Sequence, residues 1–238
     1  ATKAVAELGL KVVVSGAGGD ELFQGYEHFR TIPRLSHLAK NLSFFPGGKG
    51  LARIFGEVQA RRTHKDRWRY LSRWMNTIEG LWWLRRSIRP PSDSNVRPLL
   101  AELGFPEDDA DVVGMVRSMV GDVPHDPFLA LGLIESKTYL RNQLLRDSDW
   151  ASMYHSVELR TPLVDYHLLE SLRPVLPEFS KYPGKSLLAN APILRVPSFV
   201  TERRKTGFGI PVNTWLNINS GMSGSEGMQK FILDKFIE

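Results

Sequence analysis

The stretch VVVSGAGGDELFQGY, residues 12–26, contains the strongest indication of the fold in this chain of 238 residues. Successive side chains of a strand point to opposite faces of the sheet, so three consecutive valines make both faces apolar. This is typical of a strand that is covered on both sides in a parallel α/β sheet. A glycine-rich loop, Ser15–Gly19, follows, and Asp20 is placed to cap a helix that begins at Glu21. The stretch therefore predicts a strand, a glycine loop and a helix in direct succession.

The glycine loop is the first candidate for a functional site. Open α/β sheets bind ligands outside the carboxyl ends of their strands, and glycines let backbone N–H groups turn toward a phosphate. Asp20 and Glu21 would repel a bare phosphate, so we expect a hard cation such as Mg²⁺ between carboxylate and pyrophosphate oxygens. A tight structural turn with a capping aspartate is the alternative. The loop lacks the Gly-Lys-Ser/Thr of a Walker A motif.

The composition is that of a globular chain with a core. Apolar residues make up 42% and charged residues 24%, and no apolar run approaches the roughly 20 residues of a membrane helix, so we expect no membrane span. The 31 lysines and arginines exceed the 26 acids, which suits nucleic acid, nucleotide phosphates or no specific partner. The absence of cysteine excludes disulfides and a cysteine nucleophile within these residues, and is compatible with the cytoplasmic location that we expect.

Helices are predicted for most of the remaining chain. Residues 1–8 form a helix before the strand, Asp126 caps a long helix that starts with Pro127, and a further helix covers residues 150–159. We find little sign of further strands, and a lone strand is not stable. We therefore expect residues before Ala1 to supply most of the sheet, and we interpret the chain as a fragment.

Three strings of the sequence resemble the asparagine synthetase family. The first, residues 12–26, matches its SGxGGDELFxGY signature. The second, LLRDSDWASMYHSVELRTPLVD at residues 144–165, resembles the family's LLxxxDxxSMxxSxExRxPxxD segment. The third, RRKTGFGIPVNTWL at residues 203–216, is similar to its KxGFxxPxxxWL segment. The three strings occur in the family's order, and in the second we expect an ion pair between Glu158 and Arg160.

The resemblance implies an α/β fold of the adenine-nucleotide alpha-hydrolase (PP-loop) type. The chain would be the C-terminal part of its synthetase (ATP-pyrophosphatase) domain, mostly α-helical with one or few parallel strands near the N-terminus. We expect four regions. They are the end of the nucleotide-binding core at 1–36, a helical embellishment at 37–125, a helical part with a substrate-side loop at 126–216, and a connector with a terminal helix at 217–238.

The resemblance also implies a two-step reaction and its site residues. A carboxylate, aspartate in the type enzyme, attacks the α-phosphate of ATP, and ammonia from a glutaminase domain then displaces AMP from the acyl-adenylate. Lys205 matches the catalytic lysine that meets the phosphate charge, and Asp20 matches the acid that holds Mg²⁺. The positions expected to bind ATP are Ser15, Gly16, Ala17, Gly18 and Gly19.

One position departs from the family's pattern. Ala17 stands where glutamine-dependent asparagine synthetases usually carry Glu, and alanine cannot act as an acid or a base. Either Glu21 or water takes that role, or the substrate is another carboxylate, as in a related amidotransferase or a β-lactam-synthetase-like enzyme.

The family's SGGxDS loop and glutaminase domain are absent from these residues, so we expect the chain to be inactive alone. The sequence leaves open whether the enzyme is a homodimer.

A nucleic-acid-binding helical module is the competing hypothesis. Basic and aromatic residues interleave in one segment, but we favour a solvated helix face with Trp68 and Trp74 turned inward, because no DNA or RNA motif accompanies it. The segment contains Arg61, Arg62, Lys65, Arg67, Trp68, Arg69, Tyr70 and Arg73.

Overall fold

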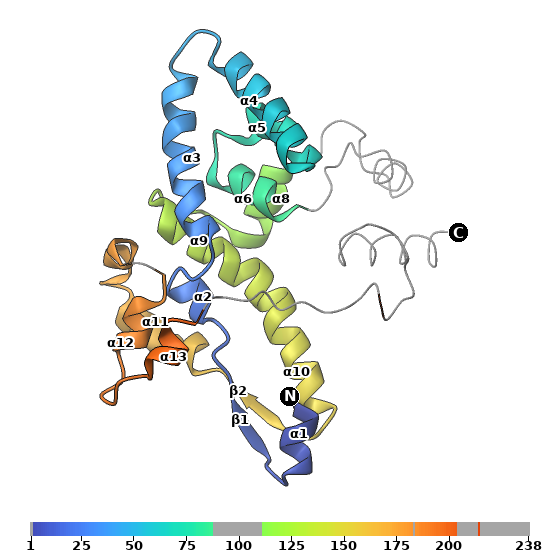
Figure 1. Ribbon diagram of the computed structural model, residues 1–238, viewed down its shortest axis with the longest axis vertical. Helices are drawn as coiled ribbons and strands as arrows, with labels where there is room; N and C mark the ends of the chain where they lie inside the picture. The colour runs from blue at the N-terminus through green and yellow to red at the C-terminus, as the bar shows by residue number, and fades with distance from the viewer. Residues whose placement is uncertain (1, 88–110, 183, 204–213, 215–238) are drawn as a thin grey trace.

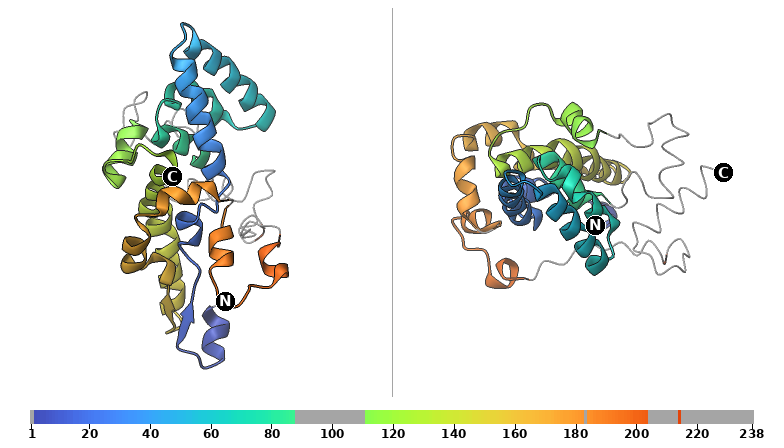
Figure 2. Two further views of the ribbon diagram at one scale, coloured as in Figure 1. Left: turned by 90° about the vertical axis from the view of Figure 1, so that its left-hand side faces the viewer. Right: turned by 90° about the horizontal axis from the view of Figure 1, so that it is seen from above.

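The computed structural model of the protein describes residues 2–87, 111–182, 184–203 and 214. The molecule is elongated, with two short strands at one end and a hairpin of two long helices at the other (Figure 1). A nearly continuous helix connects the two ends, and the views in Figure 2 show that the later, shorter helices lie beside it. The described part is therefore mostly helical with a small sheet, as the sequence predicts.

The sheet consists of two parallel strands. Helix α1 (Thr2–Glu7) precedes β1 (Val12–Val14), which pairs with β2 (Glu158–Arg160) so that Val13 lies opposite Leu159. The helix predicted over residues 150–159 is therefore wrong at its C-terminal end. The chain leaves the helix and passes through Ser156, which has a φ of 54°, before hydrogen bonds to β1 hold it extended. Long-range pairing overrides the local helical pattern here.

The expected burial of β1 on both faces is not seen among the described residues. Val12 and Val14 are 41% and 68% exposed, and Val13 is half-buried. The strand has one neighbour in the part of the chain that the structure covers. Three valines in succession therefore identified the strand and the parallel sheet, but the layers that would cover its faces are not formed by the described residues.

Helix α2 (Gly19–Leu22) begins two residues earlier than predicted. Its N-cap is Gly18, with a φ of 88°, and Asp20 lies inside the first turn, so the predicted capping role of Asp20 is wrong. Gly18 ends the loop in the left-handed region, where glycine has no steric penalty, and its carbonyl accepts a hydrogen bond from the N–H of Leu22 at 2.9 Å. The Asp20 side chain therefore does not cap the helix.

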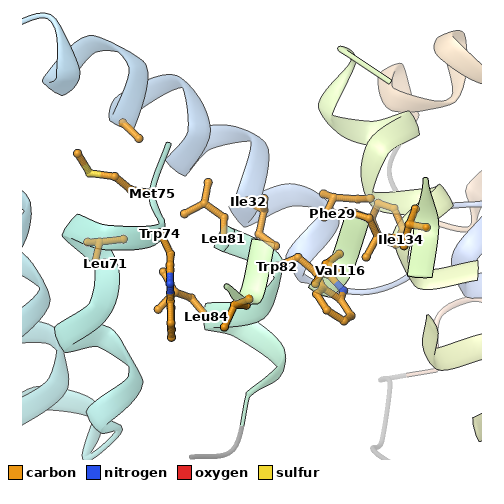
Figure 3. Close-up of a cluster of buried hydrophobic side chains, with 14 of the residues drawn as sticks. Phe29, Ile32, Leu71, Trp74, Met75, Leu81, Trp82, Leu84, Val116 and Ile134 are labelled. Carbon is orange, nitrogen blue, oxygen red and sulfur yellow. The ribbon is translucent and has the colours of Figure 1, made fainter. Parts of the chain in front are cut away.

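The middle of the chain is helical wherever the structure describes it, as predicted. Its core contains Phe29, Ile32, Trp82, Val116 and Ile134, which meet from four helices (Figure 3). These side chains are almost fully buried. The helices and turns of this part are α3 (His28–Ser43), α4 (Gly48–Thr63), η1 (Asp66–Tyr70), α5 (Leu71–Trp74), α6 (Ile78–Arg86) and α8 (Val112–Val120).

A long helical run then leads back to the sheet. It comprises α9 (Pro127–Glu135), the π-helical η2 (Ser136–Leu145) and α10 (Arg146–Met153). Asp126 Oδ1 accepts hydrogen bonds from the N–H groups of Phe128 and Leu129, each at 2.9 Å, which confirms the predicted cap. The remaining elements are η3 (Pro162–Val164), α11 (Tyr166–Leu172), η4 (Leu176–Lys181), α12 (Ser186–Asn190) and α13 (Ser198–Thr201).

The four predicted regions stay a prediction. The boundary between residues 36 and 37 falls inside α3, and the region 217–238 lies outside the described residues. Among the helices that the structure describes, none is long and apolar enough to cross a membrane.

Candidate functional site

The glycine loop lies at the carboxyl end of β1. Ser15 continues the strand pairing, because its N–H donates to the carbonyl of Arg160 at 2.8 Å. The N–H of Ala17 donates to Ser15 Oγ at 3.2 Å, and that of Gly19 donates to the carbonyl of Gly16 at 3.2 Å. Within the described residues, the N–H groups of Gly16 and Gly18 make no hydrogen bond. The loop thus retains two backbone donors for a ligand.

The glycines of the loop have different structural roles. A Cβ at Gly16 would meet nothing within 4 Å, and this residue is exposed. A Cβ at Gly18 would lie 2.7 Å from Val164 Cγ2, and one at Gly19 would lie 3.0 Å from Leu163 Cδ1. Gly18 and Gly19 therefore let η3 pack against the loop, whereas Gly16 is the glycine beside open space.

Asp20 and Lys185 form an ion pair beside the loop. The Nζ of Lys185 lies 3.3 Å from Asp20 Oδ1, and the Asp20 side chain is 25% exposed. The sequence analysis did not identify Lys185, because no local pattern marks it and α12 comes close to α2 only in the folded chain. The lysine therefore places a positive charge next to the Asp20 carboxylate.

Glu21 faces the interior beneath the loop. It is buried, and its Oε1 accepts a hydrogen bond from the hydroxyl of Tyr26 at 2.7 Å. Burial raises the pKa of Glu21, and the hydrogen bond from Tyr26 partly opposes that effect. The carboxylate considered as a substitute for the acid missing at Ala17 is thus engaged with Tyr26 in this structure.

A buried ionic cluster lies below Glu21. The fully buried Glu135 accepts hydrogen bonds from Trp82 Nε1 at 2.7 Å and from Arg86 Nε at 2.9 Å, and His28 Nε2 lies 2.7 Å from its Oε1. Burial alone raises the pKa of Glu135, but the bonds from His28 and Arg86 outweigh it, so the pKa is below its ordinary value. The Arg86 guanidinium also lies 5.2 Å from the ring centroid of Tyr26.

The sequence contained a signal for this cluster that we did not use. Glu135 is the single charged residue in the apolar run FLALGLIE of α9. A lone acid in such a run requires a buried partner, because an unpaired buried charge is strongly disfavoured. The identity of its partners was not predictable, because Arg86 and His28 come from distant helices.

Comparison with known proteins identifies the family. The family model described as "Asparagine synthase" matches residues 1–222. The chain belongs to the asparagine synthase family. It therefore has a PP-loop type of fold, as the three sequence strings imply.

The curated proteins that match this member of the asparagine synthase family are longer than the chain. Proteins of Mycobacterium tuberculosis and Mycobacterium bovis, named "Putative asparagine synthetase", glutamine-hydrolyzing, are 31% identical over 212 residues, which is 87% of this chain and 31% of theirs. Asparagine synthetase 1, glutamine-hydrolyzing, of Bacillus subtilis is 32% identical over 85 residues, which is 35% of this chain and 13% of that protein. The chain thus spans about a third of the mycobacterial relatives. No solved structure gives a significant match.

The donor atoms beside the loop fit the magnesium and ATP that the asparagine synthase family implies. Among the described residues there is no cluster of three or more potential metal ligands from His, Cys, Asp and Glu. Mg²⁺ at nucleotides is commonly held by one or two carboxylates together with phosphate oxygens and waters. A single carboxylate at Asp20 beside the unbonded amides of Gly16 and Gly18 is compatible with that arrangement.

Two further sequence predictions have different outcomes. Lys205, the predicted catalytic residue, lies outside the described residues, so its distance from the loop is untested. The predicted ion pair between Glu158 and Arg160 is confirmed, with Arg160 Nε 2.9 Å from Glu158 Oε1. Both side chains are exposed and belong to β2.

The basic segment proposed as a nucleic-acid module is used in internal contacts. Arg67 Nη1 donates to the carbonyl of Arg85 at 3.0 Å, and Arg69 Nε lies 3.1 Å from a carboxylate oxygen of Glu57. Trp74 is buried, as predicted, and Trp68 packs partly buried against the core. These contacts favour a structural role for the segment.

Acid is expected to weaken the fold through Glu135. Its pKa in the folded protein is below the ordinary value of 4.5, so its contribution is present above pH 4.5 and is lost as the pH falls through the folded pKa. We expect the free energy of unfolding of the native protein to fall more steeply with acid than that of Glu135→Gln. Urea unfolding of both proteins between pH 6 and pH 3 measures this, and parallel curves would contradict it.

Proposed function

We propose that this chain forms part of an ATP-dependent, amide-forming ligase of the asparagine synthetase type. The observation that supports it is the juxtaposition, at the carboxyl end of β1, of two unbonded loop amides with the pair of Asp20 and Lys185. In the reaction, a carboxylate attacks the α-phosphate of ATP, pyrophosphate leaves, and ammonia derived from glutamine displaces AMP. The activity belongs to a longer enzyme, because the mycobacterial relatives are about three times as long as the matched region.

The loop residues supply donors to the phosphates. The N–H groups of Gly16 and Gly18 donate to phosphate oxygens, while Ser15, Ala17 and Gly19 shape the turn that presents them. Helix α2 is a single turn, so its dipole is small and the amides with nearby cations must provide most of the attraction. Mg²⁺, when bound, neutralises charge on pyrophosphate.

Two lysines complete the proposed charge balance. Lys185 already lies beside Asp20, and Lys205 follows in the third sequence string. Both are proposed to stabilise the negative charge that grows on the phosphates in the transition state. Asp20 holds Mg²⁺ and keeps Lys185 in place.

The substrate carboxylate is proposed to be aspartate or a related carboxylate. Ala17 lacks the acid that the family usually carries, and Glu21 is turned toward Tyr26, so no side chain of the loop replaces that acid in this structure. A non-aspartate substrate, as in related amidotransferases or β-lactam-synthetase-like enzymes, is the alternative that these facts favour.

We further propose a cytoplasmic location.

The assignment is tested by ATP–pyrophosphate exchange in the complete enzyme. Asp20→Ala and Lys205→Ala are each expected to lower exchange by roughly 100-fold or more, because each removes charge stabilisation at the phosphates. Lys181→Ala is the matched control, since Lys181 is exposed and paired with Glu178. Native exchange rates in Lys205→Ala would remove that lysine from the active site, and native rates in Asp20→Ala would remove the proposed magnesium ligand.

A further inference from the structure

The segment between Asp20 and Tyr26 folds back on itself beside the loop. The N–H of Gly25 donates to the carbonyl of Asp20 at 2.8 Å. A Cβ at Gly25 would lie 1.9 Å from Asp20 Oδ1 and 3.1 Å from Asp20 Cα. The Asp20 carboxylate therefore lies directly against the backbone of Gly25, and the path of the chain there determines where the carboxylate points.

Tyr26 closes this segment. It follows Gly25 directly, and its hydroxyl donates to Oε1 of Glu21, the residue after Asp20, at 2.7 Å. The acceptor is buried, so the bond is protected from competition by water. One side chain thus connects the end of the segment to its beginning.

The Tyr26 ring is itself held by the helical part of the protein. The guanidinium carbon of Arg86 lies 5.2 Å from the centroid of the Tyr26 ring and 4.2 Å from that of Tyr139. Arg86, at the end of α6, is held in turn by Glu135 of α9 through the two hydrogen bonds from its Nε and Nη2. The contacts run without a gap from the buried ion pair, through the ring of Tyr26, to the residue next to Asp20.

We propose that Tyr26 is a positioning residue for the phosphate site, which directs the Asp20 carboxylate through its hydroxyl bond to Glu21 while Arg86 fixes its ring. This inference rests on the proposed function, because it assigns a task to Asp20. It extends that function by giving the helices α6 and α9 a role in binding magnesium nucleotide.

The test compares two tyrosines that flank the same arginine. Tyr26→Phe removes the hydroxyl that bonds Glu21, and Tyr139→Phe removes a hydroxyl from the other ring against Arg86. In the complete enzyme, we expect Tyr26→Phe to raise the Mg²⁺ concentration for half-maximal ATP–pyrophosphate exchange roughly 10-fold, as changes to groups that orient a metal ligand commonly do. Saturating Mg²⁺ should restore most of the rate. Tyr139→Phe should behave like the native enzyme.

A second readout needs neither metal nor nucleotide. Amide hydrogen exchange of the ligand-free enzyme should be faster over residues 19–26 in Tyr26→Phe and unchanged in Tyr139→Phe, because local opening follows the loss of the closing bond. Unchanged Mg²⁺ dependence in Tyr26→Phe, or a loss that Mg²⁺ does not restore, would overturn the inference.

Two remaining outcomes are also decisive. If Tyr26→Phe is globally unfolded, Arg86→Lys replaces it, since this variant retains a cation for Glu135 but loses the planar contact with Tyr26. It should raise the Mg²⁺ requirement in the same direction, and a native requirement would overturn the inference. If the native enzyme shows no exchange at any Mg²⁺ concentration, the proposed function fails, while the hydrogen-exchange comparison still decides whether Tyr26 orders the segment.

Discussion

Replacement of Glu135 by leucine is expected to lower the free energy of unfolding by about 3–5 kcal/mol, because it leaves the mostly buried Arg86 guanidinium without its counter-charge. Arg86 donates to Glu135 from a side chain that is mostly buried, and His28 lies 2.7 Å from the same carboxylate. The Trp82 N–H would also lose its acceptor. Urea unfolding at neutral pH, followed by fluorescence or circular dichroism, measures the difference.

Glu79→Leu is the matched control for this prediction. Glu79 is also buried and also accepts a hydrogen bond from an arginine, but that partner, Arg117, is 58% exposed and remains hydrated when the acid is removed. We expect Glu79→Leu to cost clearly less than Glu135→Leu. Equal losses in the two variants would show that burial of the acid, and not the burial of its cationic partner, determines the effect.

Replacement of Gly18 by alanine is expected to lower the free energy of unfolding by about 2–4 kcal/mol. Two costs combine in this estimate. Gly18 has a φ of 88°, which is unfavourable for alanine, and the added Cβ would lie 2.7 Å from Val164 Cγ2 and 3.3 Å from the carbonyl oxygen of Leu163. Urea unfolding of the purified variant checks the prediction.

Gly16→Ala provides the control within the same loop. Its Cβ would meet nothing within 4 Å, and its φ is not positive, so we expect a change of about 0.5 kcal/mol or less. A stability loss in Gly18→Ala no larger than in Gly16→Ala would mean that the loop moves away from η3 at little cost. The packing role assigned to Gly18 would then be wrong.

The parts of the fold that depend on local chemistry were predictable from the sequence. The run of valines identified β1, the glycines identified the turn that follows, and Asp126 with Pro127 identified the start of α9. In each case the residue types determine the backbone within a few positions, through a run of β-branched residues, a left-handed turn or a helix cap. The ion pair of Glu158 and Arg160 was predictable for the same reason, because the two residues are close in the sequence.

The parts that depend on distant contacts were not predictable. Strand β2 has three residues and becomes a strand only by pairing with β1, so the helical pattern before it led us to extend the helix too far. Lys185, the residue before the short helix α12, reaches Asp20 from far along the chain. The partners of Glu135 come from α3 and α6, and periodicity within one helix contains no information on which side chains will surround it.

The parallel pairing of β1 with β2 has a kinetic consequence. Most of the helices described above lie between the two strands in the sequence, so this ladder can close only after a very long stretch of chain has been brought together. The entropy lost in closing such a loop makes non-local pairing slow compared with helix formation. The helices should therefore assemble first. The backbone of the nucleotide loop, whose Ser15 amide bonds to the last residue of β2, should acquire its native geometry among the final events of folding.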